Sequence, residues 1–211
     1  MTEVVVATTN AKKLGEIRAV FAPLGLRALG LGDVPGGDAI AEPVEDGATF
    51  EANALLKAAH YARAIGRVCL ADDSGLEVDA LGGDPGVHSA YYAHGLEEGP
   101  RVAREVRDPA NNAKLLRALE GVPERERTAR FVCVMAVADP EGNALATSRG
   151  EFEGRIGEAA RGANGFGYDP LLVLEDGRTS AELSPEEKNA RSHRGAAARG
   201  IAGALLEILR G

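Results

Sequence analysis

The first 22 residues place a strand directly before a helix, and this order is what most limits the folds open to the chain. Residues 3–8 are apolar and β-branched, which predicts a strand. Residues 12–22 predict a helix, because Leu14, Ile17 and Phe21 recur at helical spacing. A strand that is followed at once by a helix is typical of an α/β protein.

The rest of the chain adds a second helix, further strands and a hairpin. We predict a helix at 49–65, a buried strand at 67–71 and an extended segment at 75–81. Residues 128–152 predict two strands joined by an Asp-Pro-Glu-Gly turn, which is an antiparallel hairpin. Early alternation of helix and strand followed by a hairpin predicts an α/β fold with a mixed sheet.

Capping signals mark the starts of three later helices. Asp108 is predicted to cap one helix, with Pro109 as its first residue. Ser184 is predicted to cap another, with Glu187 as its capping-box partner. The last helix is predicted to start at Ser192.

Composition narrows the class of protein. The 211 residues suit one large domain or two intimate lobes, and 45% of them are hydrophobic, enough for a sizeable core. A net charge of −8 disfavours a protein that binds duplex nucleic acid, because such proteins carry a basic face. No apolar run is long enough to span a bilayer and no signal-peptide pattern is present, so we expect a cytoplasmic protein without membrane partners. Cys69 and Cys133 lie in apolar runs and are predicted to be reduced core residues.

The turn after the first strand reads Ala-Thr-Thr-Asn-Ala-Lys-Lys, from Ala7 to Lys13. Only five of the 24 basic residues are lysines, so two adjacent lysines at this turn are notable. A helix N-terminus presents free N–H groups and a partial positive charge, and it binds phosphate readily. The turn is therefore either a phosphate site or an Asn-capped helix start with two solvated lysines.

Two aspartates, Asp72 and Asp73, follow the predicted strand at 67–71 and precede Ser74 and a glycine. Sites in open α/β sheets lie beyond the carboxyl ends of strands. Adjacent residues of an extended chain point opposite ways, so the two carboxylates are predicted to have different roles, one of them binding Mg²⁺ or orienting water. The structural alternative is a turn held by side-chain hydrogen bonds.

Two later segments combine features that suit a nucleotide base. "GANGFGYDP" sets Phe166 and Tyr168 among glycines in a chain with 4% aromatic residues, so the rings either stack on a base or pack in the core. "EEKNARSHRG" gathers basic residues close to a helix start, and it is either an anion or carbonyl site or a solvated connector.

The order of these motifs resembles the inosine triphosphate pyrophosphatase family. The resemblance runs from about residue 4 to the last helix through "ATTNAKK", "DGATFEANALLKA", "ADDSGLEVDALGGDPGVHSAYYA", "GANGFGYDP" and "ELSPEEKNARSHRG", while residues 100–145 contribute little. It implies a single pyrophosphatase domain at 1–211, with an elongated two-lobed fold around a twisted mixed sheet and an active-site cleft between the lobes. It further implies a homodimer that uses Mg²⁺ to split ITP, dITP and XTP into the monophosphate and pyrophosphate.

The resemblance also implies roles for individual residues. Asp73 falls on the catalytic proton acceptor and metal ligand, and Glu45 falls near the family's metal-binding glutamate. The implied substrate-binding residues are Thr8, Thr9, Asn10, Ala11, Lys12, Lys13, Ser74, Phe166, Gly167, Tyr168, Asp169, Lys188, His193 and Arg194. Arg194 has only donors, so it is expected to favour a 6-keto base over adenine, or else to pair within its own helix.

Three positions depart from the family pattern. Thr9 stands where glycine is common, His88 where tyrosine is common, and Tyr91 where arginine is frequent. Two alternatives to the predicted activity stay open. One is a septum-inhibitor-like nucleotide pyrophosphatase, although those usually open with a Ser-Pro-Arg-Arg turn. The other is a non-catalytic nucleotide-binding sensor, which the Asp72–Asp73 pair disfavours.

Overall fold

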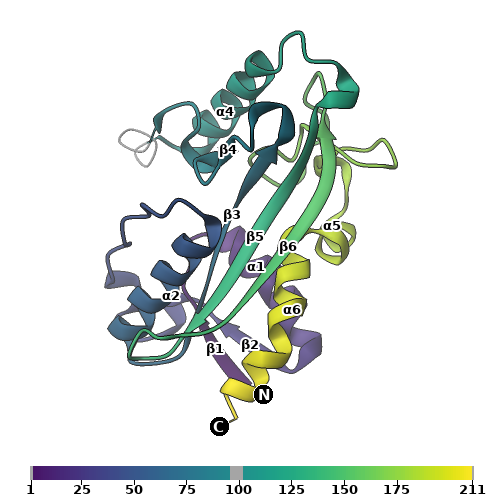
Figure 1. The fold of residues 1–211 in the computed structure, drawn as a ribbon. Coiled ribbons are helices and arrows are strands. Elements are labelled where there is room, and N and C mark those ends of the chain that lie inside the picture. Colours follow the sequence, from purple (N-terminus) through teal and green to yellow (C-terminus); the bar gives the residue numbers. More distant parts are fainter. Residues whose placement is uncertain (1, 96–101, 211) are drawn as a thin grey trace. The chain divides into compact units, whose positions relative to one another are not determined.

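A computed structural model describes residues 2–95 and 102–210 of the chain. Within these residues seven strands form one mixed sheet in the order β2-β1-β3-β5-β6-β7, with β4 paired to β3. The strands are β1 (Thr2–Val6), β2 (Leu26–Leu29), β3 (Cys69–Val78), β4 (Pro85–Gly86), β5 (Thr128–Ala138), β6 (Ala144–Ile156) and β7 (Leu172–Val173). The helices are α1 (Ala11–Phe21), α2 (Phe50–Ile65), α4 (Arg104–Ala118), α5 (Pro185–Arg191) and α6 (His193–Ile208). The predicted α/β fold with a mixed sheet is confirmed (Figure 1).

The chain divides into two compact units. Unit 1 comprises Met1–Asp73, Cys133–Glu151 and Ser192–Gly211, and unit 2 comprises Ser74–Val132 and Phe152–Arg191. In the described part of the chain, no helix is long and apolar enough to cross a membrane.

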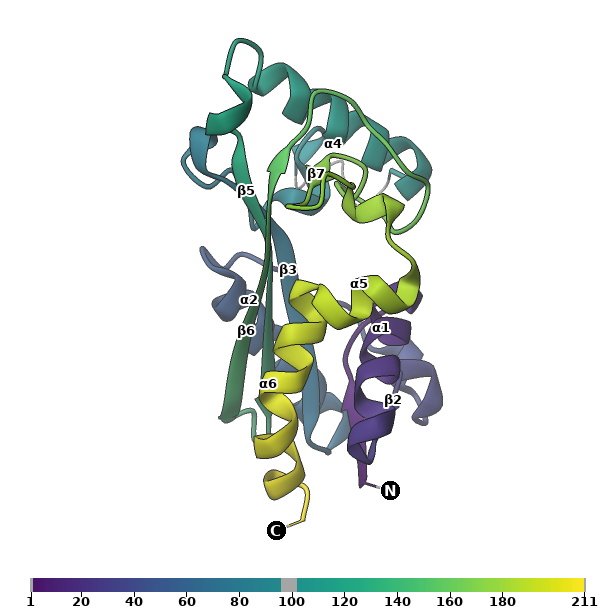
Figure 2. The same cartoon turned by 90° about the vertical axis from the view of Figure 1, so that its right-hand side faces the viewer.

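Unit 1 is built on parallel strands. β1 pairs in parallel with β2, from Thr2 opposite Leu26 to Val5 opposite Leu29. It also pairs in parallel with the start of β3, where Val6 lies opposite Leu70. Helices α1 and α6 pack against each other, as Figure 2 shows. Their apolar faces and the strands form a core that includes Ile17, Phe21, Leu70, Met135 and Ile201.

Unit 2 has its own core. Buried side chains from the end of β3, from α4 and from β5 pack with residues of the 168–183 segment. The members include Leu76, Leu115, Phe131, Tyr168 and Leu171.

The predicted end of the strand at residue 71 is wrong. β3 continues through Asp72, Asp73 and Ser74 to Val78, and its later part pairs with β4. The two aspartates therefore lie within a strand. They come shortly after Leu70, the last residue of β3 that pairs with β1. Within the strand the two carboxylates point to opposite sides of the sheet, and each has a charged partner there, so the alternative of a turn held by side-chain hydrogen bonds is wrong.

Local capping signals were mostly correct. Asn10 caps α1, Ser192 caps α6, and Ser184 and Glu187 form the predicted capping box at the start of α5. The predicted cap at Asp108 is wrong, because α4 begins at Arg104 and contains Pro109 in its interior. The Asp108 carboxylate instead accepts a hydrogen bond from the backbone N–H of Gly167, 2.8 Å away.

Candidate active site

The strand-to-helix turn is held by its own side chains. Asn10 Oδ1 accepts from the backbone N–H groups of Lys12 and Lys13, at 3.1 and 3.4 Å. Thr8 Oγ1 accepts from the N–H of Asn10, and Thr9 Oγ1 donates to Glu42. Asn10 is the cap, as predicted, but the two lysines differ: Lys12 is exposed, whereas Lys13 is half-buried and its ammonium lies against Asp72, so the alternative of two solvated lysines is wrong for Lys13. Ala11 is exposed as well.

Asp72 lies in a buried cluster of charges within unit 1. Lys13 Nζ lies 3.0 Å from Asp72 Oδ2, and the Arg194 guanidinium donates to the same oxygen at 3.3 Å. Arg194 also pairs with Glu16 at 2.5 Å, and Cys133 Sγ lies 3.8 Å from Asp72. Burial alone would raise the pKa of Asp72, but the two cations lower it well below its usual range, so the carboxylate stays ionised.

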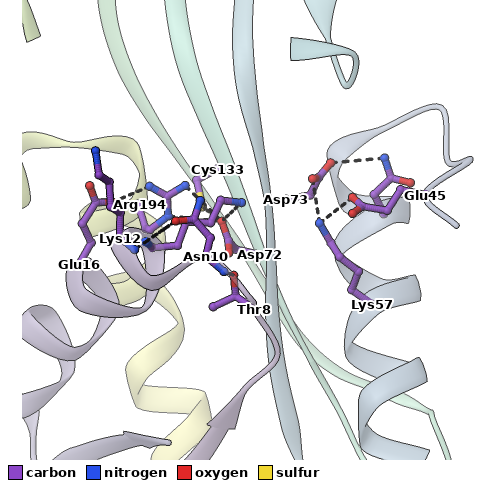
Figure 3. A network of polar contacts seen from close by, with 12 residues as sticks. Thr8, Asn10, Lys12, Glu16, Glu45, Lys57, Asp72, Asp73, Cys133 and Arg194 are labelled. Atoms are coloured by element: carbon purple, nitrogen blue, oxygen red, sulfur yellow. Dashed lines mark hydrogen bonds and ion pairs between the residues drawn. The ribbon is translucent and has the colours of Figure 1, made fainter. Parts of the chain in front are cut away.

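Asp73 belongs to a different group, also within unit 1. Lys57 Nζ lies 3.0 Å from Asp73 Oδ1 and 2.7 Å from Glu45 Oε2, so one ammonium group bridges the two carboxylates. Burial would lower the pKa of Lys57, but the carboxylates of Asp73 and Glu45 raise it above its ordinary value. Figure 3 shows Asp72 and Asp73 on opposite sides of β3, as the alternation of a strand requires.

Asn53 ties the Glu45 loop to this group. Its Oδ1 accepts from the N–H of Gly47 at 2.8 Å, and its Nδ2 donates to Gly47 O at 3.3 Å and to Asp73 Oδ2 at 3.4 Å. Asn53 packs so closely against Gly47 that a Cβ added at position 47 would lie 2.5 Å from Asn53 Oδ1. Asn53 thus fixes the loop that carries Glu45 against the strand that carries Asp73.

Lys57 and Asn53 lie within the quoted "DGATFEANALLKA" segment, but the resemblance assigned neither of them a role. They lie four positions apart on α2, so they share one face of that helix. The available signal was a lysine and an asparagine together on the polar face of an otherwise apolar helix. That signal does not reveal a target in β3, because the contacts span 16 and 20 residues of sequence.

In unit 2 the two aromatic rings of the "FGYDP" segment lie in different environments. Tyr168 is buried in the core, and its hydroxyl donates to Ser89 O at 2.9 Å. Phe166 is half-buried, with the ammonium of Lys188 5.1 Å from its ring centroid. Tyr168 therefore packs in the core, which is one of the two predicted alternatives, whereas the Phe166 ring remains partly accessible.

Asp169 anchors this segment. Its Oδ2 accepts from the N–H of Phe166 at 2.7 Å and from Lys188 Nζ at 2.5 Å, and its Oδ1 accepts from Ser180 Oγ at 2.7 Å. Asp169 and Lys188 are both buried. Because the same Asp169 oxygen accepts from the Phe166 N–H, this ion pair fixes the backbone at Phe166.

The remaining predicted residues lie elsewhere in the two units. Ser74 is a half-buried residue of β3 in unit 2. His193 and Arg194 are the first residues of α6 in unit 1, and both are buried. Arg194 is 1% exposed, with its guanidinium held by Asp72 and Glu16.

Two of the departures from the family pattern share one cavity. His88 and Tyr91 both line a cavity of about 350 Å³ in unit 2. The Arg107 guanidinium lies 4.9 Å from the centroid of the Tyr91 ring. A cation is therefore present beside the position where arginine is frequent, although it comes from a different element.

The two groups of unit 1 define a class of protein. A lysine-bearing helix N-terminus and a carboxylate pair are suited to a phosphorylated ligand and a divalent cation. The protein is thus an α/β protein whose lysine-bearing turn and carboxylate pair have the chemistry that such ligands require. The chain belongs to the Ham1 family, whose family model matches residues 4–204.

Known relatives resemble the chain along almost its whole length. A dITP/XTP pyrophosphatase of Nitratidesulfovibrio vulgaris is 51% identical over 206 residues, which cover 97% of this chain and 94% of the relative. One from Geobacillus kaustophilus is 50% identical and covers 92% and 89%. A solved HAM1 protein structure from Coxiella burnetii has a TM-score of 0.82 and 38% identity, covering 98% of this chain and 100% of that one.

Proposed function

We propose that the protein hydrolyses non-standard purine nucleoside triphosphates (ITP, dITP and XTP) to the monophosphate and pyrophosphate, and so removes them from the nucleotide pool. The observation that carries this proposal is the Glu45–Lys57–Asp73 group in a chain whose relatives are named dITP/XTP pyrophosphatases. Cleavage between the α and β phosphorus needs neutralised phosphate charge, an activated water and a pocket for the base.

Phosphate binding is assigned to the turn from Thr8 to Lys13. Lys13 stands in the first turn of α1, where the helix N-terminus and the ammonium group both attract an anion. The Lys13 ammonium is paired with Asp72 in the structure. Because Arg194 contacts the same carboxylate oxygen, Asp72 keeps a cationic partner when Lys13 turns toward a phosphate.

Asp73 is assigned as the general base that takes a proton from the attacking water. Glu45 and Asp73 also fit Mg²⁺, which is usually bound by one or two carboxylates together with substrate phosphates. Among the described residues, no group of three or more His, Cys, Asp or Glu side chains is placed to hold a metal ion by itself. When bound, Mg²⁺ supplies charge neutralisation at the leaving pyrophosphate.

Base recognition is assigned to Ser74, Phe166, Gly167, Tyr168, Asp169, Lys188, His193 and Arg194, following the family resemblance. Within this set Phe166 offers the accessible ring, while Asp169 and Lys188 hold the segment in place. Hypoxanthine and xanthine carry a 6-keto acceptor where adenine carries an amino donor. A guanidinium such as that of Arg194 therefore discriminates between them if it reaches the base.

The same resemblance supports the remaining parts of the proposal. We propose that residues 1–211 act as one functional domain, that the assembly is a homodimer, and that it works in the cytoplasm without nucleic-acid or membrane partners. The acidic net charge of −8 agrees with a small-molecule substrate rather than a nucleic acid.

The experiment is pyrophosphate release from ITP, with and without Mg²⁺, and with ATP as the comparison substrate. The expected result is release that requires Mg²⁺ and is much faster with ITP than with ATP. Binding of ITP without release would identify a sensor instead. Equal rates with ITP and ATP would remove base selectivity from the proposal.

A further inference from the structure

One face of helix α4 is directed at the "FGYDP" segment. Arg104, Asp108 and Asn112 are spaced four residues apart, so they lie along one side of the helix. All three contact Phe166 or Gly167, within unit 2. This helix lies in the part of the sequence that contributes least to the family resemblance.

Two of these residues hold the same glycine. Asp108 Oδ2 accepts from Gly167 N at 2.8 Å, and Asn112 Nδ2 donates to Gly167 O at 3.1 Å. Gly167 has a φ of +61°, a conformation that favours glycine. Both hydrogen-bonding groups of this residue are therefore occupied by α4, and its unusual backbone conformation is fixed there.

The neighbouring aromatic residue, Phe166, has partners at its ring and at its backbone. The Arg104 guanidinium lies 4.9 Å from the centroid of the Phe166 ring, within cation–π range. The N–H of Phe166 is held by Asp169. The backbone on each side of the ring and the ring itself thus have partners before any ligand binds, and such preorganisation lowers the entropic cost of binding.

We propose that this face of α4 sets the position of the Phe166 ring and thereby the affinity and selectivity for the purine base. Asp108 is a positioning residue that acts through Gly167, and Arg104 acts directly on the ring. The inference rests on the proposed function, in which Phe166 contacts the base. It adds a specificity element that lies outside the family's motifs.

Asp108 can hold Gly167 because α4 starts four residues before it, at Arg104. Since α4 begins at Arg104, the Asp108 side chain is one turn inside the helix and caps no N–H of its own first turn. Its hydrogen bond instead spans 59 residues of sequence to reach Gly167. An ionised acceptor makes a stronger hydrogen bond than a neutral one, so this contact is well suited to hold a glycine loop.

The test measures two affinities in buffer containing Mg²⁺: that of inosine monophosphate, which carries the base, and that of inorganic triphosphate, which does not. Asp108→Ala should weaken inosine monophosphate binding by roughly 10-fold, as expected for a lost hydrogen bond to a charged group, and leave triphosphate binding unchanged. Asp108→Asn keeps an oxygen acceptor and should recover most of the affinity.

Arg104→Gln provides a second variant, because it removes no backbone hydrogen bond. It should lower the ITP/ATP ratio of kcat/KM, whereas the matched control Arg117→Gln, at an exposed position of the same helix, should not. Equal losses for both ligands, unchanged affinity in Asp108→Ala, or an Asp108→Asn variant as weak as Asp108→Ala would each overturn the inference. Wild-type pyrophosphate release from ITP is measured first: its absence counts against the proposed function, whereas unaltered variants of an active wild type count against α4 alone.

Discussion

Asp72 and Asp73 are adjacent in β3, yet their carboxylates contact different cations from different helices. Asp72 pairs with Lys13 of α1 and Arg194 of α6, whereas Asp73 pairs with Lys57 of α2. The alternation of side chains along a strand produces this separation. β3 thus contributes one carboxylate to each of two separate groups of ion pairs. Substitutions at the two aspartates should therefore have different consequences.

Asp73→Asn keeps the shape of the side chain but removes its charge and basicity. Turnover of ITP should fall by about 10²-fold or more, as for the loss of a catalytic acid–base group. Pyrophosphate release at saturating Mg²⁺ measures this, with the exposed Asp38→Asn as the control. Near wild-type turnover would remove Asp73 from the reaction.

Asn53→Ala should raise the Mg²⁺ concentration that activity requires, without removing a carboxylate. Partners that orient metal ligands typically contribute roughly 10–100-fold in affinity or activity. Gly47→Ala tests the same contact from the other side, because its new Cβ would fall against Asn53 Oδ1. The Mg²⁺-induced rise in melting temperature should need more metal in both variants than in the exposed control Glu51→Ala. Unchanged metal dependence in both variants would contradict the role assigned to Asn53.

Lys13→Ala should weaken ITP binding more than inosine monophosphate binding, because the lysine is assigned to the β and γ phosphates. The loss should shrink at high salt, where charge pairs are screened. Lys12→Ala, one residue earlier on the exposed side of the turn, should cost less. Equal losses for the two ligands would mean that Lys13 does not contact the outer phosphates.

Arg194→Ala should destabilise the fold, because it leaves the buried Asp72 carboxylate with one cation fewer. Breaking a buried ion pair costs roughly 3–5 kcal/mol, which denaturant unfolding measures. A base-reading role predicts in addition that the ITP/ATP ratio of kcat/KM falls by roughly 10-fold. Lower stability with an unchanged ratio would assign Arg194 to the ion cluster alone.

Both cysteines should be unreactive in the native protein. Burial raises the pKa of Cys69 and of Cys133 to about 12. At pH 8 the thiolate fraction of such a group is only about one part in 10⁴, and the thiolate is the reactive form. A colorimetric thiol reagent should detect two thiols per chain after unfolding in guanidinium and almost none before. Prompt reaction of the native protein would contradict the burial of these side chains.

The features that the sequence predicted correctly depend on neighbouring residues. Asn10, Ser184 and Ser192 cap helices that start within three residues of them, so a local pattern was sufficient. The errors concern residues with distant partners. The sequence around Asp108 suggests a helix cap, but its partner is Gly167. The sequence around Asp72 suggests a turn, but one of its partners is Arg194, 122 residues further along the chain.

The candidate site shows the same division. The family resemblance implied roles for Asp73 and Glu45, but it assigned none to Lys57, which lies in one of the quoted segments and bridges the two carboxylates. Its function depends on a contact with β3 that no local spacing encodes. Arg194 was noticed for its chemistry, whereas its pairing with Glu16 spans 178 residues and required the fold.

The position of Arg104, Asp108 and Asn112 has a consequence for how relatives of this protein are compared. These three residues of α4 contact Phe166 and Gly167 but lie outside the motifs, so a comparison of motif residues alone does not include them. Two chains with identical motifs but different residues at these three positions would share the reaction and differ in substrate preference. Assigning a preferred nucleotide to such a chain therefore requires a look at this helix as well as at the signature segments.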